Sequence, residues 1–232
     1  MKLLVADFDD TLFDGKNYQK NLDYINKFTE AGHLFIIATG RYKDSLLSDM
    51  NGFKIPYSYL ICNDGAIIFD KNLNVIYRKD IPKQVSYDIA IKLKQENFIV
   101  SCYIDTGLTL TKEADVTANK VIGKFNNRDK AEELLEHINN KYSGVNGYLS
   151  TKWLNITERN VNKGEGIKYV ADLLNINYNN IYTIGDNIND LSMSNYKFNS
   201  YAMDNSVEEL KKVTKKTYGA VYELIEDILK DE

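Results

Sequence analysis

The chain has 232 residues, of which 44% are apolar and 27% are charged, a globular composition that excludes wholesale disorder. Its 29 Lys and Arg against 33 Asp and Glu give a net charge of −4, without the basic stripe that nucleic-acid binders usually show. Cys62 and Cys102 are too few for a disulfide framework and fit a reducing compartment. The first 40 residues have no apolar run long enough for a signal peptide or membrane span. We therefore expect a mildly acidic cytoplasmic protein that binds neither nucleic acid nor a membrane.

The first 80 residues alternate short apolar runs with amphipathic segments. The apolar runs predict buried strands at residues 2–6, 33–38 and 59–62. Apolar side chains at helical spacing predict helices at residues 17–31 and 42–50. This β-α-β-α-β order is typical of a parallel, doubly wound, Rossmann-like sheet with both faces covered. A predicted hairpin, with strands at residues 66–69 and 74–77, follows the third strand.

The pattern changes after residue 80 and returns near residue 157. Between them the sequence predicts helices at residues 82–96 and 129–142, each followed by strands. This repeated α-β-β order is typical of an α+β module on an antiparallel sheet. Residues 164–229 then resume the doubly wound alternation, and Ser206-Val207-Glu208-Glu209 predicts a capping box. We interpret residues 1–80 and 157–232 as a discontinuous α/β core and residues 81–156 as an inserted α+β cap.

The segment Asp7-Phe8-Asp9-Asp10-Thr11 follows the first predicted strand directly. Strand residues two apart face the same side, so Asp7 and Asp9 can point together into the crevice where open α/β sheets bind ligands. Paired carboxylates there can hold a divalent cation. One carboxylate can also act as a nucleophile while the other does acid–base work. Taken alone, the motif fits an Asp-rich turn equally well.

Three further segments stand at predicted strand ends or helix starts. Thr39-Gly40-Arg41 follows the second strand and precedes a helix, where a hydroxyl and free backbone N–H groups can bind an anion. Lys163 opens a helix, a position that disfavours cations unless an anion lies beside it. Gly185-Asp186-Asn187-Ile188-Asn189-Asp190 places two carboxylates and two amides at a strand-to-helix turn. Together the four predict a magnesium site of oxygen ligands, a phosphate-binding cradle and a carboxylate able to attack phosphorus.

These residues, in this order, resemble the motifs of the haloacid dehalogenase superfamily of phosphatases. The long insert between the second and third motifs is similar to the type IIB cap of the Cof subfamily of sugar-phosphate phosphatases. Residues 63–66 and 203–205 also match Cof-type segments. Asp10 and Asn187 stand where glycine is commoner in the family, and Ser206 replaces a usual alanine. None of these departures removes a chemical group that the reaction uses.

The resemblance implies a Mg²⁺-dependent phosphatase of a small phosphorylated metabolite, specifically a sugar phosphate. Asp7 would attack phosphorus to form an aspartyl-phosphate, and Asp9 would protonate the leaving alcohol and then take a proton from water. The implied metal ligands are Asp7, the main-chain carbonyl of Asp9, and Asp186. Asp190 would bind the metal through water or would support the residues that bind it. The implied contacts to the phosphoryl oxygens are Thr39, Gly40, Lys163 and Asn189. Arg41 would contact the substrate.

Two other functions fit the same residues. A phosphomutase or phosphotransferase would share the aspartyl-phosphate step and differ only in the acceptor. A non-enzymatic phospho-acceptor switch also uses carboxylates, a Thr and a Lys on a doubly wound sheet, but it needs only one small domain without a cap. The sequence carries no signal for the oligomeric state. We expect cap loops to select the substrate, with the Gly107 turn and Ala118-Asn119-Lys120 as candidates that the sequence does not rank.

Overall fold

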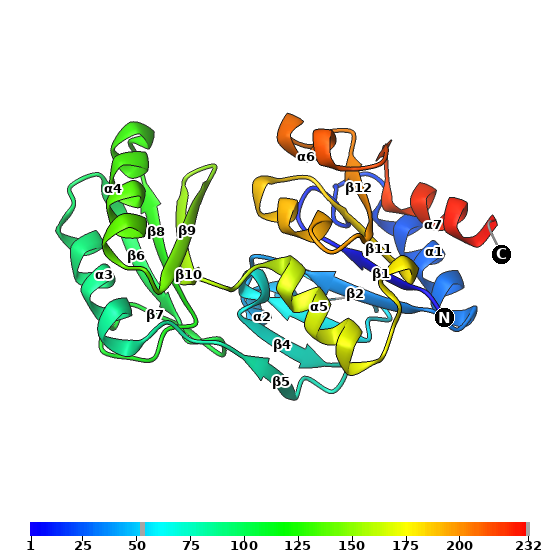
Figure 1. Ribbon diagram of the computed structural model, residues 1–232, viewed down its shortest axis with the longest axis horizontal. Coiled ribbons are helices and arrows are strands. Elements are labelled where there is room, and N and C mark those ends of the chain that lie inside the picture. The colour runs from blue at the N-terminus through cyan, green and yellow to red at the C-terminus, as the bar shows by residue number, and fades with distance from the viewer. Residues whose placement is uncertain (52–53, 231–232) are drawn as a thin grey trace.

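A computed structural model describes residues 1–51 and 54–230, so the predicted end of the core at residue 232 lies outside the described residues. Two sheets lie side by side along the long axis of the molecule, and the chain crosses between them twice (Figure 1). We call the larger one the core sheet and the smaller one the cap sheet. Within the described residues, no helix is long and apolar enough to cross a membrane.

The core sheet has a parallel body with an antiparallel hairpin at one edge. In spatial order its strands are β13 (Thr217–Tyr218), β12 (Asn199–Met203), β11 (Ile181–Gly185), β1 (Leu3–Ala6), β2 (Leu34–Ala38), β3 (Tyr59–Cys62), β4 (Ile67–Asp70) and β5 (Val75–Arg78). From β1 the chain first adds β2 to β5 on one side, and after the cap it adds β11 to β13 on the other side. This reversal beside β1 creates the crevice at the carboxyl ends of the strands where such folds bind ligands.

Side-chain alternation along β1 gives the core sheet two buried faces. Leu4 and Ala6 belong to one hydrophobic cluster, which is covered by α1 (Tyr18–Glu30), α2 (Lys43–Asp49) and α7 (Val221–Lys230). Leu3 and Val5 belong to the other, which is covered by α5 (Lys163–Leu173). Successive strand residues point to opposite faces, so an unbroken apolar run is the pattern of a strand covered on both sides.

The cap sheet is antiparallel and carries its helices on one face only. Its strands, in spatial order, are β7 (Leu110–Thr111), β6 (Ile99–Asp105), β8 (Lys120–Phe125), β10 (Trp153–Glu158) and β9 (Val145–Ser150). Val121, Leu154 and Ile156 pack beneath α3 (Lys83–Gln95) and α4 (Arg128–Lys141), which form the outer side of the cap (Figure 1). The alternate side chains of these strands are left to face the core.

The predicted architecture, a doubly wound α/β core with an inserted α+β cap, is confirmed. The expected boundary at residue 156 falls inside β10, whose last residues, Thr157 and Glu158, still pair with Asn146 and Val145 of β9. We therefore propose that the cap ends after Glu158. Glu158 forms a 3.0 Å ion pair with Lys79. This pair joins the two points at which the chain crosses between core and cap.

The capping box predicted at Ser206 is wrong. The helix α6 (Glu208–Val213) begins one residue later, with Val207 at the N-cap position and no side-chain capping bond. The hydroxyl of Ser206 is buried without a hydrogen-bond partner among the residues that the structure describes. The Val207 N–H donates instead to the main-chain carbonyl of Asp186, 2.9 Å away, so a tertiary contact replaces the local cap.

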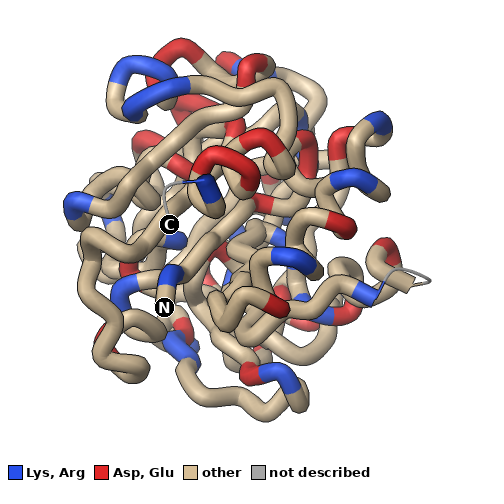
Figure 2. The backbone as a smooth tube through the Cα atoms, turned by 90° about the vertical axis from the view of Figure 1, so that its right-hand side faces the viewer, with Lys and Arg blue, Asp and Glu red and all other residues tan. Residues whose placement is uncertain are grey.

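Charged residues are spread over the surface of the core. Figure 2, in which the core end of the molecule faces the viewer, shows Lys and Arg positions interspersed with Asp and Glu positions. Several of these form exposed ion pairs along helices, such as Lys168 with Asp172 on α5 and Lys230 with Glu226 on α7. Exposed pairs of this kind contribute about 0.3–0.5 kcal/mol each, so the fold depends on its apolar clusters rather than on them.

Candidate active site

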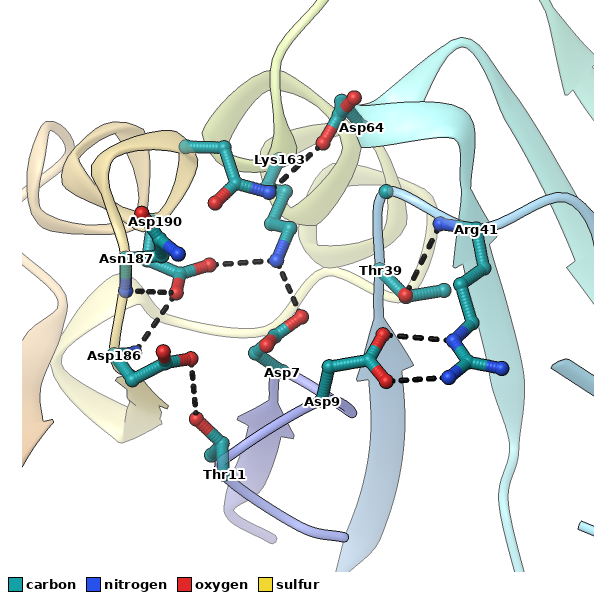
Figure 3. Close-up of polar contacts among 12 residues, drawn as sticks. Asp7, Asp9, Thr11, Thr39, Arg41, Asp64, Lys163, Asp186, Asn187 and Asp190 are labelled. Carbon is teal, nitrogen blue, oxygen red and sulfur yellow. Dashed lines mark hydrogen bonds and ion pairs between the residues drawn. The ribbon is translucent and has the colours of Figure 1, made fainter. Parts of the chain in front are cut away.

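Three aspartates meet at the carboxyl edge of the core sheet. Asp7 follows β1, Asp186 follows β11, and Asp190 lies in the 3-10 helix η3 (Ile188–Ser194). Because β1 and β11 pair in parallel, their carboxyl ends lie at the same edge. One carboxylate oxygen from each of the three lies within 4.8 Å of the others, and all three residues are largely buried (Figure 3). The structure therefore brings together three of the four aspartates that the motifs marked as metal ligands.

Lys163 enters this cluster from the first turn of α5. Its ammonium is fully buried and donates to Asp7 Oδ1 at 2.5 Å and to Asp190 Oδ1 at 2.6 Å. Burial alone would lower the pKa of Lys163, but the carboxylates of Asp190, Asp7 and Asp64 outweigh it and raise the pKa overall. The lysine therefore stays charged. Its position depends on Gly164, because a Cβ there would lie 2.1 Å from the Ser192 carbonyl oxygen.

Asp190 holds the turn that carries Asp186. Its Oδ2 accepts the backbone N–H groups of Asp186 at 2.9 Å and of Asn187 at 3.0 Å. Asn187 caps the same helix by accepting the Ile188 N–H, so the capping box of this region lies at Asn187 and Asp190. With Lys163 on its other oxygen, Asp190 has both oxygens engaged by protein donors.

The electrostatics of the cluster favour a cation. Burial raises the pKa of Asp7 well above its ordinary value, Lys163 opposes this, and the Asp190 and Asp186 carboxylates add to it. Burial, followed by the Asp190 charge, raises the pKa of Asp186 to about 6, while Thr11 donates its hydroxyl to Asp186 Oδ1 at 3.0 Å. One ammonium does not balance three carboxylates, so the remaining negative charge suits a bound cation.

The donor set fits a hard divalent cation. Among residues 1–51 and 54–230, neither Asp7 Oδ2 nor Asp186 Oδ2 accepts a hydrogen bond, and the main-chain carbonyl of Asp9 is also without a donor. Oxygen ligands of this kind are those that Mg²⁺ prefers in proteins. Asp7 and Asp186 are therefore the carboxylates with an oxygen left for the ion, and the Asp9 carbonyl is the further ligand that the motif resemblance implies.

Asp9 lies beside the cluster but its side chain is turned away from it. Both of its carboxylate oxygens accept from the Arg41 guanidinium, at 2.7 Å from Nε and 2.5 Å from Nη2 (Figure 3). Arg41 also pairs with Asp49 on α2, and its backbone N–H donates to Thr39 Oγ1 at 3.2 Å. The Asp9 side chain is 47% exposed, which leaves it accessible from the cleft.

A cleft of about 770 Å³ separates these residues from the cap. Its core wall includes Asp7, Asp9, Gly40, Arg41, Asp186 and Asn189. Its cap wall is formed by Tyr103, Leu110, Lys120, Ile122, Tyr148, Ser150, Thr151, Trp153 and Asn155. The two walls thus come from segments far apart in the sequence.

Sequence reasoning gave Asp64 and Tyr148 no role in the site, and it named Lys120 only within an unranked candidate stretch of the cap. Asp64 lies in the 3-10 turn η1 (Asn63–Gly65) after β3, at the same sheet edge, and its carboxylate accepts from both cap side chains. It also accepts the Asn189 side-chain amide at 3.0 Å, so Asn189 faces Asp64 rather than open solvent. The available signal was the Asn-Asp-Gly turn at a parallel strand end, the place where the other motifs stand.

This fold and site, a buried Asp–Lys–Asp cluster at the edge of a doubly wound sheet beneath an inserted cap, define a capped α/β hydrolase with phosphatase chemistry. The chain belongs to the family described as haloacid dehalogenase-like hydrolase, whose sequence model matches residues 4–116 and 109–223. The family's general use of a divalent metal agrees with the donor set described above.

Individual relatives agree with this assignment along nearly the whole chain. The phosphatase YwpJ of Bacillus subtilis is 24% identical over 266 residues, which cover 92% of this chain and 93% of the relative. A solved haloacid dehalogenase-like hydrolase from B. subtilis superposes with a TM-score of 0.87 at 19% identity, covering 97% of this chain and 99% of the other. The subclass IIB sugar phosphatase BT4131 superposes with a TM-score of 0.82 at 19% identity, covering 100% and 98%. The resemblance inferred from the motifs is confirmed, and phosphatase activity is supported.

Proposed function

We propose that this protein is a Mg²⁺-dependent phosphatase that hydrolyses a small phosphorylated metabolite through an aspartyl-phosphate on Asp7. The observation that carries the proposal is the position of Asp7, which is buried at the base of the cleft. Lys163 donates to one of its oxygens, and no donor from the described part of the chain reaches the other. A bound Mg²⁺ would supply positive charge to the phosphoryl oxygens and to the attacking carboxylate. Lys163 stays charged at neutral pH and adds to that charge.

We assign the following roles to the residues in and beneath the cleft. Asp7 attacks phosphorus, and Asp9 first protonates the leaving oxygen and then accepts a proton from the hydrolytic water. The metal ligands are Asp7, the Asp9 carbonyl and Asp186, with Asp190 fixing the Asp186 turn. The proposed contacts to the phosphoryl oxygens are Thr39, Gly40, Lys163 and Asn189.

Arg41 is the proposed substrate contact at the mouth of the site. Its guanidinium holds the Asp9 carboxylate in a bidentate pair. A phosphate ester entering the cleft offers Arg41 a second bidentate partner of the same geometry. Transfer of Arg41 from Asp9 to the ester would release the Asp9 carboxylate toward the leaving oxygen, which couples substrate binding to the acid–base step.

A sugar phosphate is the substrate class that the cap wall fits best. Tyr103, Ile122 and Trp153 offer apolar surfaces on which the C–H faces of a sugar ring can pack. Ser150, Thr151 and Asn155 offer hydroxyl and amide groups for sugar hydroxyls. The solved relative BT4131 carries the name sugar phosphatase. Both cysteines are buried thiols, which agrees with a reducing cytoplasm.

Turnover of p-nitrophenyl phosphate by the purified protein with Mg²⁺ tests the proposal. We expect phosphate release that Asp7→Asn lowers by about 10³-fold or more, because the nucleophile is removed while the shape of the site is kept. Asp23→Asn, a change on the exposed side of α1, is the matched control and should retain full activity. Activity that survives Asp7→Asn would remove the nucleophile from this account. Phosphoryl transfer between sugar hydroxyls without free phosphate would show a mutase instead.

A further inference from the structure

One carboxylate joins the cap to the proposed phosphate-binding residues. Asp64 Oδ2 accepts Lys120 Nζ at 2.6 Å and the Tyr148 hydroxyl at 2.9 Å, and both donors belong to the cap. Its Oδ1 accepts the Asn189 amide at 3.0 Å from the core. Lys120 also donates to the Gly40 carbonyl at 3.1 Å. Two cap donors and two phosphate-binding segments therefore meet at this side chain.

The turn that carries Asp64 is fixed to the loop after β2. Its Asn63 N–H donates to the Arg41 carbonyl at 2.9 Å, and its Asp64 N–H donates to the Thr39 carbonyl at 3.0 Å. Asn63 and Asp64 both have left-handed backbone conformations, with φ of 50° and 57°. Non-glycine residues adopt this region rarely, and such positions cluster at sites where geometry serves function. The backbone that carries the Asp64 carboxylate is therefore tied to the Thr39–Arg41 loop.

The contact between Asp64 and Lys120 is a buried ion pair between two domains. The Lys120 side chain is 2% exposed and that of Asp64 is 5% exposed. Burial alone would raise the pKa of Asp64, but Lys120 and Lys163 outweigh it and lower the pKa overall. Because Lys120 begins β8 in the cap, the pair exists only while the cap lies over the core as it does here. Loss of either partner leaves the other charge buried and unpaired, which is costly.

We propose that Asp64 is a positioning residue that links closure of the cap to the geometry of the phosphate-binding groups. This inference rests on the proposed function. When Lys120 and Tyr148 reach Asp64, its other oxygen holds the Asn189 amide and its backbone holds the Thr39 segment. When the cap opens, Asp64 loses both cap donors, and Asn189 loses a partner whose position those donors fix. A phosphoryl group is then held well only in the closed form.

Asp64→Asn and Lys120→Met, alone and combined, test this link. Asn keeps the size of Asp64 but loses its charge, and Met keeps the length of Lys120 without its ammonium. The probe is inorganic phosphate in the presence of Mg²⁺, with its Kd measured by calorimetry alongside the KM for p-nitrophenyl phosphate. We expect each single variant to weaken phosphate binding about tenfold, with a smaller change in kcat. The double variant should be no weaker than either single one, because both changes break the same link.

Cap position is measured separately by small-angle X-ray scattering. The Asp64→Asn variant should show a larger radius of gyration than the wild-type protein, because the cap has lost its buried partner. Tyr148→Phe removes only one hydrogen bond and should change phosphate affinity in the same direction by less, which guards against a variant that fails to fold. Glu96→Gln, which weakens a partly exposed ion pair with Lys92 on the outer side of the cap, is the matched control and should leave phosphate affinity and scattering unchanged.

The outcomes separate this inference from the proposed function. Unchanged phosphate affinity and unchanged scattering in Asp64→Asn would overturn the inference, whether or not the wild-type protein turns over. Losses that multiply in the double variant would also overturn it, since they would mean independent roles for Asp64 and Lys120. A wild-type protein that closes and binds phosphate through this link, yet releases no phosphate from esters, would overturn only the proposed function.

Discussion

The carboxyl group of Asp186 links the site to the stability of the whole chain. Burial and the neighbouring Asp190 raise its pKa from an ordinary value of 3.8 to about 6. The folded state therefore binds this proton more tightly than the unfolded state does. As pH rises from below 3.8 through 6, the unfolded chain loses the proton first, so the free energy of unfolding falls. At 1.36 kcal/mol for each pH unit the loss is about 3 kcal/mol, and it is complete above pH 6.

Asp186→Asn should therefore stabilise the metal-free protein at pH 8 but not at pH 4. Asn keeps the hydrogen bond from Thr11 and has no charge to desolvate. Urea unfolding in the presence of a chelator, at both pH values, measures the difference in unfolding free energy between variant and wild type. We expect that difference to be larger at pH 8 by up to about 3 kcal/mol. A difference that is the same at both pH values, as we expect for the exposed Asp23→Asn, would refute this view of Asp186.

The neighbours of Asp7 explain how much of the site could be predicted from sequence. Asp7, Thr39 and Asp186 each follow a strand whose apolar run is legible, and parallel strands end at the same edge, so their meeting follows from local pattern. The direction in which each side chain points does not follow from the local pattern. Asp9 faces Arg41, and Asn189 faces Asp64, because of partners that the local sequence does not reveal.

Among the elements, the start of α5 depends most on close packing. Gly164 lies against the Ser192 carbonyl of η3. A Cβ at position 164 would lie only 2.1 Å from that carbonyl oxygen. Gly164→Ala must push α5 away from η3 and carry Lys163 with it. Forced overpacking of this kind costs about 1–3 kcal/mol, and displacement of the ammonium from Asp7 weakens catalysis as well.

We expect Gly164→Ala to lower both the melting temperature and kcat for p-nitrophenyl phosphate, the latter by about tenfold or more. Thermal unfolding and steady-state kinetics on the same sample measure the two effects. Gly144→Ala is the matched control, because nothing lies within 4 Å of a Cβ at that position in the cap. A Gly164→Ala protein with wild-type kcat would show that Lys163 does not depend on this packing.

Element boundaries were harder to predict than element types. The strand β10 extends past residue 156 because its ladder with β9 continues, and pairing across a hairpin is not visible in either strand alone. The helix α6 starts without the Ser206 cap because the Val207 N–H finds the Asp186 carbonyl. In both places a tertiary contact decided what the local sequence left undetermined.

At the scale of the whole molecule, the arrangement of core and cap follows from the order of predicted elements, but the closure between them does not. Lys120 and Tyr148 lie 56 and 84 residues from Asp64 in the sequence, and they meet it only because the cap sheet turns one face to the core. Alternation along β8 and β9 predicts that some side chains face the cleft. It does not predict which of them reach the core.

If Asp7 is the nucleophile, it becomes phosphorylated during turnover, and the Asp9→Asn variant should trap that state. The aryl oxide of p-nitrophenyl phosphate leaves without protonation, so the first step survives, while the second step loses the base that activates water. We expect a burst of about one p-nitrophenolate per protein molecule. After acid quenching, mass spectrometry should then find one phosphoryl group on the peptide that contains Asp7. A phosphoryl group on another residue, or turnover with no burst and no modified peptide, would contradict the account.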